Sequence, residues 1–289
     1  PLKEELVSEK ISSEASEKTI YDSFFHHKKW VINEDFDISS SNKDTVFVLI
    51  HGNAFGNENL SKGLRDKGKR VIDVFSSDSN FKKKNEDTYF VENNVDSYKE
   101  LFANLSNIKI SKIVHLGAYR NNEVLNPKDI YTELENGFFN VINLVKGLMK
   151  ARLDQKIELV LIGCNAYGIS GNENNLMPHN ATVLSLGKVI EQEYQNLKCS
   201  AIDVDMISTE KNILEQLLAD NSGMYLIGLR EGKRYIEEFD EVEVKPVTDK
   251  RIVNGGTYII TGGTSGIGLQ NAKLFSEQAK CNLILISRK

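Results

Sequence analysis

The sequence lacks most of the features that mark membrane proteins, secreted proteins and nucleic-acid-binding proteins. Its 289 residues include four prolines, three cysteines and one tryptophan. No apolar run approaches the roughly 18 residues that a membrane-spanning helix needs, and no signal-peptide pattern opens the sequence. The net charge is −5 and no basic patch stands out, which argues against nucleic acid as a partner. We therefore expect a cytoplasmic globular protein that binds neither nucleic acid nor a membrane.

The few cysteines and histidines are too scattered for a metal centre. Cys164, Cys199 and Cys281 are far apart, and each sits in or beside an apolar, strand-like run. We predict that they are small buried hydrophobic side chains in a reducing compartment. His51 and His115 both end predicted strands without a matching cluster of acids or cysteines, so we expect structural roles for them. The sequence predicts no metal site.

The strongest pattern lies near the end of the sequence, where a glycine-rich turn joins an apolar run to a helix. The run Tyr258–Ile260 predicts a buried strand, and apolar residues from Leu269 onward follow helical spacing. The turn consists of Thr261, Gly262, Gly263, Thr264, Ser265, Gly266, Ile267 and Gly268. Its glycines permit a tight bend, a close approach of backbone to a pyrophosphate, and close helix–strand packing. The new helix adds free N–H groups and the positive end of its dipole, so we predict a dinucleotide site.

The strand that follows indicates which dinucleotide. Residues 281–286 are apolar and lead into Ser287, Arg288 and Lys289. Sites that prefer NAD usually place a carboxylate at this point, where it accepts from the ribose hydroxyl. Two cations suit a 2′-phosphate instead. The predicted cofactor is NADPH.

Strands and helices alternate through the rest of the chain. Strands are predicted at 30–32, 45–50, 71–75, 89–91, 112–116, 157–162 and 199–204, with a hairpin at 225–229 and 234–242. Helices are predicted from 58 to about 67 and at 94–105, 131–150, 181–194 and 213–218. Residues 76–87, which include Lys82 to Lys84, are predicted to be a polar loop. The alternation favours an α/β fold with a doubly wound parallel sheet, Rossmann-like, in which 246–289 begin a second Rossmann unit.

The first strand–turn–helix unit repeats the later one without its chemistry. It runs from His51 to Glu58 and keeps two glycines, but Glu58 takes the place of the third, and a carboxylate there would repel a pyrophosphate. A short-chain dehydrogenase also needs a serine, a tyrosine and a lysine. Those positions fall near Cys164, Leu176 and Asn180, and the lysine position for nearby Tyr167 is Gly171. We therefore expect a dehydrogenase fold without catalytic residues.

This combination resembles the ketoreductase domain of modular, bacterial polyketide synthases, which belongs to the short-chain dehydrogenase/reductase superfamily. The residues that carry the resemblance are Gly228–Tyr235, like the closing hairpin of a structural subdomain; Gly256–Gly268, like the opening of the catalytic subdomain; and Ala181–Glu193 followed by Ala201–Asp203. The resemblance covers residues 28–289. It implies a linker or helix at 1–29, a structural subdomain at 30–245 and an incomplete NADPH-binding subdomain at 246–289.

The resemblance also implies an activity. Such domains reduce the β-keto group of an intermediate held by an acyl carrier protein, beside neighbouring synthase domains. The family's Ser, Tyr and Lys or Asn lie beyond Lys289, so no catalytic residue is assigned and turnover by this chain alone is not expected. The expected cofactor residues are Thr261–Gly268 and Ser287–Lys289.

Three other interpretations remain open. The chain could be a non-catalytic scaffold that braces neighbouring synthase domains. A stand-alone dehydrogenase of another family is disfavoured by the two tandem Rossmann openings. An α/β-hydrolase is disfavoured because Gly168–Asn172, the nearest match to a nucleophile elbow, lacks its last glycine. Lys82–Lys84 is expected to be solvated, with contact to an acidic carrier protein as the alternative.

Overall fold

The computed structural model describes residues 25–38, 45–52, 58–78, 81–119, 126–242 and 251–288. The chain divides into two compact units. The larger unit is Lys28–Asp240, and the smaller one combines Pro1–His27 with Glu241–Lys289. Of the linker or helix predicted at 1–29, residues 1–24 lie outside the described residues, as does the predicted domain boundary at 245–246, whereas residues 26–29 form part of a strand, which corrects the prediction.

A ten-stranded sheet forms the centre of the larger unit, in the order β1-β10-β9-β8-β7-β6-β2-β3-β5-β4. The strands are β1 (His26–Ile32), β2 (Val46–His51), β3 (Arg70–Ser76), β4 (Lys82–Asn85), β5 (Thr88–Val91), β6 (Lys112–Ala118), β7 (Ile157–Cys164), β8 (Leu197–Val204), β9 (Leu226–Arg230) and β10 (Lys233–Glu241). Every neighbouring pair from β9 across to β5 is parallel, whereas β10 and β4 pair antiparallel with β9 and β5. The winding reverses between β2 and β6, which confirms the predicted doubly wound sheet.

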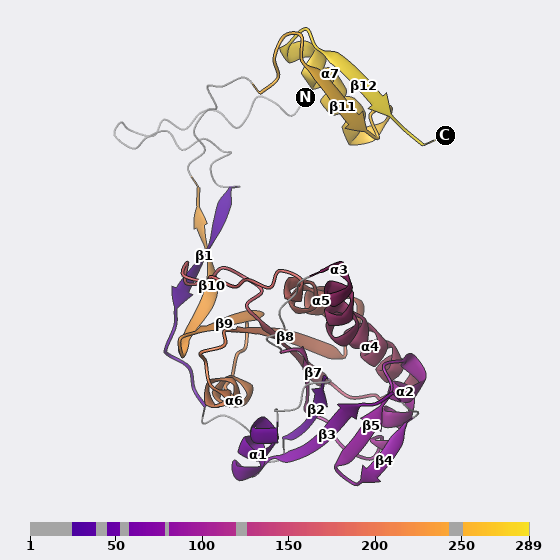
Figure 1. Cartoon of the computed structure of the whole chain (residues 1–289), viewed down its shortest axis with the longest axis vertical. Helices are drawn as coiled ribbons and strands as arrows, with labels where there is room; N and C mark the ends of the chain where they lie inside the picture. Colours follow the sequence, from indigo (N-terminus) through magenta and orange to yellow (C-terminus); the bar gives the residue numbers. More distant parts are fainter. Residues whose placement is uncertain are drawn as a thin grey trace, which may run out of the picture. The chain divides into compact units, whose positions relative to one another are not determined.

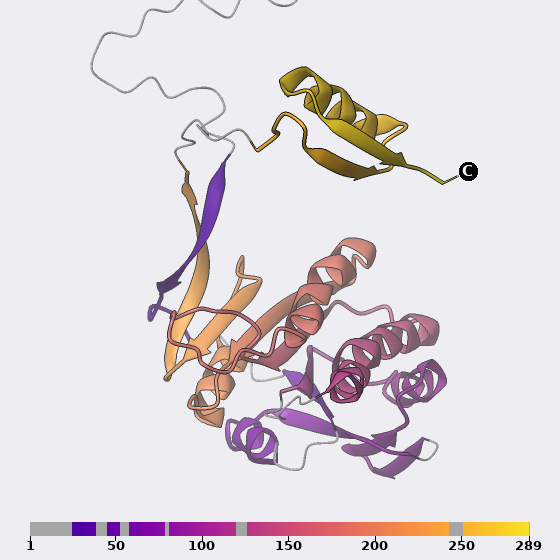
Figure 2. The same cartoon turned by 45° about the horizontal axis from the view of Figure 1, so that its top comes forward.

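Helices cover both faces of this sheet. They are α1 (Glu58–Asp66), α2 (Val95–Asn104), α3 (Pro127–Leu134), the π-helix η2 (Glu135–Phe139), α4 (Asn140–Ala151), α5 (Asn180–Glu193) and α6 (Glu210–Leu218). Figure 1 shows α1 and α6 on one side of the strands and α2, α4 and α5 on the other, and the turned view in Figure 2 agrees. Among the described residues, no helix combines the length and the apolar character that crossing a bilayer requires.

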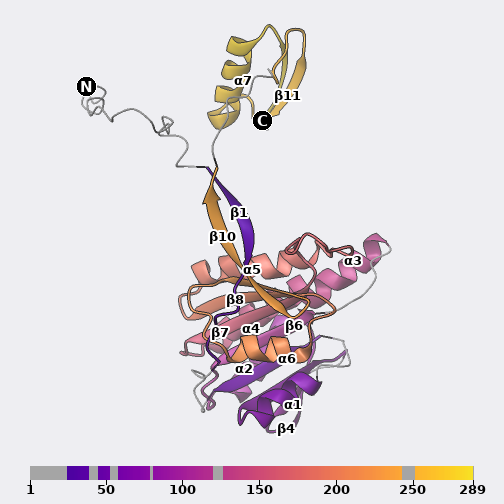
Figure 3. The same cartoon turned by 90° about the vertical axis from the view of Figure 1, so that its left-hand side faces the viewer.

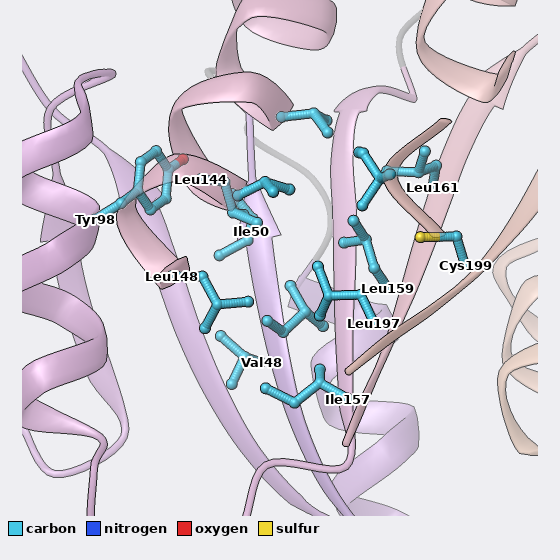
Figure 4. Close-up of a cluster of buried hydrophobic side chains, with 14 of the residues drawn as sticks. Val48, Ile50, Tyr98, Leu144, Leu148, Ile157, Leu159, Leu161, Leu197 and Cys199 are labelled. Atoms are coloured by element: carbon cyan, nitrogen blue, oxygen red, sulfur yellow. The ribbon is translucent and has the colours of Figure 1, made fainter. Parts of the chain in front are cut away.

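The core follows directly from the period-two alternation of the strands. Val48 and Ile50 of β2 belong to the cluster under α2, α4 and α5, whereas Phe47 and Leu49 belong to the cluster under α1 and α6. Figure 4 shows the first cluster, in which side chains from β2, β7 and β8 meet Tyr98 of α2 and leucines of α4. Because both faces of the central strands are buried, these strands have continuous apolar sequences.

The outermost strand, β1, pairs with β10 as an antiparallel ribbon, which Figure 3 shows from the side. The Asn33 N–H donates to Arg234 O at 2.9 Å. Charges face each other across the ribbon: Lys28 Nζ lies 2.7 Å from a carboxylate oxygen of Glu237, and Lys29 Nζ lies 3.0 Å from one of Asp240. The predicted first strand and the predicted closing hairpin are confirmed.

The smaller unit contains the strand, helix and strand expected there: β11 (Thr257–Thr261), α7 (Gly266–Gln278) and β12 (Asn282–Ile286). The prediction that the first of these strands is buried is wrong, because Ile259 is 65% exposed and its neighbours Tyr258 and Ile260 are half-buried. The two strands pair in parallel as a sheet of their own. Tyr258 of β11 meets Phe275 of α7 edge to face, with ring centres 5.3 Å apart. A parallel pair joined by a helix is the opening of a Rossmann unit, as predicted.

The prediction of a loop over residues 76–87 is wrong. Residues Lys82–Asn85 form β4, which pairs antiparallel with β5 at the edge of the sheet. All four side chains are exposed, and Lys83 forms an ion pair with Glu86. Nothing apolar marks this strand, because an edge strand that is solvated on both faces needs only its backbone pairing.

The prediction of one helix over residues 131–150 is also inaccurate. The helical segment begins at Pro127, capped by Asn126, and the π-helix η2 interrupts it. Gly117 of β6 lies so close to this π-turn that an added Cβ would fall 2.1 Å from Asn136 O. The apolar spacing could not show the interruption, because a single wide turn shifts the helical pattern by only about one residue.

Candidate nucleotide-binding site

The glycine-rich turn is held against the end of the neighbouring strand. The parallel register pairs Thr261 of β11 with Ile286 of β12. The N–H groups of Gly262 and Gly263 then donate to Ile286 O at 2.7 and 3.3 Å. These bonds bring the two halves of the predicted site, the turn and residues 287–288, next to each other along the backbone.

Two of the turn's glycines adopt conformations that other residues rarely adopt. Gly262 has φ = +69° and Gly266 has φ = +51°. An added Cβ would meet nothing within 4 Å at either position. The backbone conformation, rather than the available space, therefore requires glycine at both.

Gly268 is required for the opposite reason, because the helix lies directly on the turn. An added Cβ at Gly268 would fall 2.3 Å from Gly262 O and 2.7 Å from Gly262 C. The first turn of α7 therefore packs against backbone with no side chain between them. This is the close helix–strand packing that the sequence pattern predicts for the last glycine.

The start of α7 leaves its amides available. Ser265 is the N-cap residue, in an extended conformation, and its side chain makes no capping bond. The N–H of Leu269 donates to Ser265 O at 3.2 Å, so Gly266–Gly268 precede the first intrahelical bond. Bare amides at the positive end of a helix dipole fit an anionic pyrophosphate.

Most of the predicted site is open to solvent. The exposed residues are Thr261, Gly262, Thr264, Ser265, Gly266, Ile267, Ser287 and Arg288, whereas Gly263 is buried and Gly268 is half-buried. Arg288 places an exposed positive charge two residues after the end of β12. Lys289, the second predicted cation, lies outside the described residues.

At the matching strand ends of the larger unit, the described residues form a buried polar cluster. Residues 53–57 and the Glu58 side chain lie outside what the structure describes. Asp73 of β3 accepts from His51 Nε2 at 2.7 Å, from Ser61 Oγ at 2.5 Å and from Arg65 at 2.5 Å. Burial opposes ionisation of Asp73, but these bonds outweigh it and hold the pKa below its usual range. His51 therefore joins β2 to β3, a structural role as expected.

His115 also serves the fold. Its Nε2 lies 3.0 Å from Asn140 Oδ1, which accepts from the Tyr98 hydroxyl at 2.6 Å as well. The N–H of Gly117 donates to His115 Nδ1 at 3.3 Å. Complete burial lowers the pKa of His115 to about 4, so the imidazole is neutral at physiological pH. This network ties α2 and β6 to the first residue of α4.

The positions that a dehydrogenase uses for catalysis hold inert groups in the larger unit. Cys164 is buried at the end of β7, and Leu176 is exposed. The Asn180 amide donates to Cys164 O at 2.8 Å, so it pins α5 to the strand end. Tyr167, the nearest tyrosine, shares a hydrogen bond of 3.0 Å with Ser185 Oγ. None of these groups can pair a proton-donating tyrosine with a neighbouring lysine in the way this chemistry requires.

Two of the three cysteines have the buried environment that the sequence predicts. Cys164 and Cys199 are buried, and Cys281 is half-buried. Burial raises the pKa of the Cys199 thiol to about 12. Within the described ranges, no group of three or more His, Cys, Asp or Glu side chains is arranged to hold a metal ion.

Known proteins show which family this chain represents. A family model described as "Beta-ketoacyl synthase-like, N-terminal" matches residues 47–221, which is more than half of the chain. The chain belongs to this family. Its match to the polyketide synthase PksM of Bacillus subtilis (strain 168) is 28% identical over an alignment of 160 residues, and it covers 51% of this chain and 3% of that protein.

Solved structures related to this family member show the fold. One is described as an "adenylation, ketoreductase, and pseudo Asub multidomain structure of a keto acid-selecting NRPS module"; it matches with a TM-score of 0.71, 19% identity, and coverage of 91% of this chain and 23% of that chain. Another is an N-terminal ketoreductase from a macrolactin assembly line, with a TM-score of 0.68, 19% identity, and coverage of 90% and 53%. These matches confirm the fold that the resemblance to polyketide synthase ketoreductases implies.

Sequence reasoning missed one set of buried charges. Asp203 of β8 and Arg230 of β9 form an ion pair of 2.7 Å, and Glu173 from the loop before α5 lies 3.0 Å from Arg230. The signal was present: a charged side chain within an apolar strand has to find a partner when that strand is buried. The pairing itself could not be seen, because the partners are 27 and 57 residues apart.

Proposed function

We propose that this chain is part of a polyketide synthase ketoreductase, which uses NADPH to reduce the β-keto group of an intermediate tethered to an acyl carrier protein in the cytoplasm. The observation that carries the proposal is the turn between β11 and α7. Its amides bind Ile286 O, two residues before Arg288, and the helix that follows the turn starts without a side-chain cap. Backbone amides suit a pyrophosphate, and a guanidinium suits a 2′-phosphate.

Each part of the turn has a task in this proposal. The amides of Gly266–Gly268 would hold the pyrophosphate, Gly262 and Gly263 fix the turn on β12, and Ser287, Arg288 and Lys289 would hold the 2′-phosphate. Any other residue at Gly262 or Gly266 would strain the backbone of the turn, and any other residue at Gly268 would separate α7 from it. The bound nicotinamide supplies the hydride for the reduction. The residues of this chain bind and orient the nucleotide, and none of them is assigned to proton transfer.

The larger unit has a structural task in the same proposal. Its catalytic positions hold a buried thiol, an exposed leucine and an asparagine bonded to backbone. The partners would be an acyl carrier protein and neighbouring synthase domains, in keeping with multidomain relatives. The second candidate function, a non-catalytic scaffold between synthase domains, is favoured by these same inert positions and requires no nucleotide.

Nucleotide binding by the full 289-residue chain separates the two functions. The probe is 2′,5′-ADP, compared with ADP, by saturation-transfer NMR and isothermal titration. A reductase subdomain that reads the 2′-phosphate binds 2′,5′-ADP at least about tenfold more tightly than ADP. Arg288→Ala abolishes this difference, because it removes the described cation next to the turn.

Arg251→Ala is the matched control, since Arg251 is an equally exposed arginine of the smaller unit, before β11. It leaves the preference for 2′,5′-ADP intact. Equal binding of the two nucleotides by the unaltered chain would refute the assignment to NADPH. No binding of either nucleotide would favour the scaffold.

A second measurement addresses catalysis. We expect no oxidation of NADPH when this chain alone is mixed with a β-keto thioester, because the positions of the larger unit that match the catalytic serine, tyrosine and lysine hold Cys164, Leu176 and Asn180. Turnover that survives Tyr167→Phe would place a proton donor elsewhere in the chain and contradict the structural task given to the larger unit.

A further inference from the structure

The loop between β7 and α5, residues 165–179, folds around one carboxylate. The N–H groups of Ile169 and Ser170 donate to Glu173 Oε1 at 2.8 and 2.7 Å, and the N–H of Gly171 donates to Oε2 at 3.0 Å. The Ser170 hydroxyl adds a bond of 3.1 Å to Oε1. Gly171 has φ = +85°, which turns its amide toward the same point as the two before it. Three successive amides that converge in this way form an anion-binding nest.

Arg230 completes the electrostatics of this nest. Its Nε donates to Glu173 Oε1 at 3.0 Å, and its Nη2 donates to Tyr167 O at 2.8 Å. The same guanidinium donates to Asp203 Oδ2 at 2.7 Å. The Glu173 side chain is only 7% exposed and that of Arg230 only 3%, so solvent screens this pair weakly. The nest therefore pairs converging amides with a buried cation.

Asp203 neutralises Arg230 independently of Glu173. It accepts from the N–H groups of Ala166 and Tyr167 at 2.9 and 3.0 Å. Burial raises the pKa of Asp203, against the opposing effect of Arg230. For Glu173, burial acts in the same direction, but the amides of Ser170 and Ile169 and the guanidinium bring its pKa down to about 2. Glu173 is thus bound in the nest as a full anion.

Contacts that do not involve Glu173 also fix the position of this loop. Ile169 is buried against β9, where an added Cβ on Gly228 would fall 2.4 Å from Ile169 Cδ1. The N–H of Met177 donates to Asn165 O at 2.7 Å and closes the two ends of the loop. These contacts do not involve Glu173, so the amides of residues 169–171 can keep their arrangement when the carboxylate is removed.

We propose that Ile169–Gly171 and Arg230 form a binding site for a small carboxylate, which the chain fills with its own Glu173. The site is built from backbone amides and a buried guanidinium, the donor set that recognises a carboxylate with two acceptor oxygens. Occupation by Glu173 locks the loop on β8 and β9. Once Glu173 is shortened, an external carboxylate of the size of formate or acetate occupies the same place.

Chemical rescue of the full-length chain tests this proposal. Glu173→Ala lowers the Tm by about 6 °C, because the amides and Arg230 lose their common acceptor. Acetate, exchanged for chloride at constant ionic strength and pH 7, restores about half of that loss with saturation in the millimolar range. Pivalate, which has a bulky tert-butyl group, restores nothing. Glu173→Gln keeps the shape but not the charge, and gains nothing from acetate.

Glu193→Ala is the matched control, because Glu193 is an exposed acid on α5 in the same unit. Neither it nor the unaltered chain changes its Tm when acetate replaces chloride. An equal response of all variants would show a general salt effect and overturn the proposal, as would a Glu173→Ala chain that acetate does not stabilise.

Hydrogen exchange gives a readout at the loop itself. In Glu173→Ala, the amides of residues 169–171 exchange about 100-fold faster than in the unaltered chain, and saturating acetate recovers about tenfold of this protection. Recovery elsewhere in the chain without recovery at these three amides would place the acetate at another site and refute the proposal.

Discussion

The two units contain the same strand–helix–strand element and use its polar positions in opposite ways. In the larger unit, β2 pairs with β3 so that His51 faces Phe75, and in the smaller unit, β11 pairs with β12 so that Thr261 faces Ile286. This common register aligns the two elements residue by residue. The differences between them can therefore be attributed to single side chains rather than to a different architecture.

Two aligned positions show the contrast. In the larger unit, the residue two positions before Phe75 is Asp73, which is buried and binds His51, Ser61 and Arg65. Its counterpart in the smaller unit, two positions before Ile286, is Ile284, which is 48% exposed. Arg288, two positions after Ile286, is exposed and follows the strand end that binds the glycine turn. The larger unit directs its polar groups inward to hold the element together. The smaller unit leaves amides and a cation facing outward, where a ligand could use them.

Backbone conformation follows the same division. Among the described residues, the larger unit places Arg152, Asn165 and Glu231 in the left-handed region, whereas all such residues of the smaller unit are glycines: Gly255, Gly262 and Gly266. Side chains there cost stability. Among its described residues, the smaller unit avoids that cost.

The largest expected effect comes from the inward-directed cluster. Asp73→Ala leaves a buried histidine and serine and a nearby arginine without their acceptor, and we expect a loss of about 4 kcal/mol in the free energy of unfolding. Urea denaturation followed by fluorescence reports on the larger unit, because Trp30 of β1 is the single tryptophan. Ile284→Ala, at the aligned position, should leave this transition unchanged. A loss below about 1 kcal/mol for Asp73→Ala would remove the distinction between the two elements.

The second-largest expected effect is a loss of folding stability in acid, which should occur in the larger unit only. His115 is neutral in the folded state with a pKa of about 4, below the unfolded value of 6.5, so the unfolded chain binds the extra proton first. Stability falls as the pH drops from about 6.5 toward 4, by roughly 3 kcal/mol in total. Asp73, whose pKa is lowered, adds a further loss only below its unfolded value of 3.8.

The described part of the smaller unit buries no titratable side chain, so it should lack this window. The measurement is the free energy of unfolding between pH 7 and 4, from Trp30 fluorescence. His115→Leu should remove most of this pH dependence above pH 4.5, and the half-buried His179, whose pKa burial also lowers, should leave a smaller slope. An unchanged slope in that variant would assign the acid sensitivity to another group.

A substitution in the turn should act on the smaller unit alone. Gly268→Val places a side chain 2.3 Å from Gly262 O, and we expect about 30-fold weaker binding of 2′,5′-ADP, or ~2 kcal/mol. The Trp30 unfolding transition should not move. Gly168→Ala is the glycine control in the larger unit, since an added Cβ there meets nothing within 4 Å. Retained nucleotide binding in Gly268→Val would show that the helix need not pack on the turn.

The smallest expected effect is a gain, rather than a loss, in the free energy of unfolding. Arg152 ends α4 in the left-handed conformation, and Arg152→Gly should stabilise the larger unit by about 1 kcal/mol. Lys146→Gly, at an exposed position within the same helix, should destabilise it by a similar amount. Urea denaturation of both variants checks the signs, and equal signs would mean that the left-handed conformation carries no strain.

Much of the fold was accessible from the sequence, because local patterns determine it. Apolar runs at 45–50, 112–116 and 157–162 became central strands, and the predicted hairpin across Glu231 and Gly232 is present. The turn at 261–268 was predicted by its glycines, whose spacing reflects backbone conformation and close packing within a few residues. The cofactor residues remain predictions, although the turn and the end of β12 do lie together.

What the sequence determined by itself was therefore local: where strands and helices begin, and where a turn must be made of glycine. Three features were decided only by the tertiary structure. Lys82–Asn85 became a strand because β5 offered an edge, η2 widened where Gly117 approaches it, and Glu173 found a nest and an arginine 57 residues away. Each depends on groups that are distant in sequence. Periodicity measures only neighbours along the chain, whereas burial, pairing and charge balance are set by which elements the fold brings together.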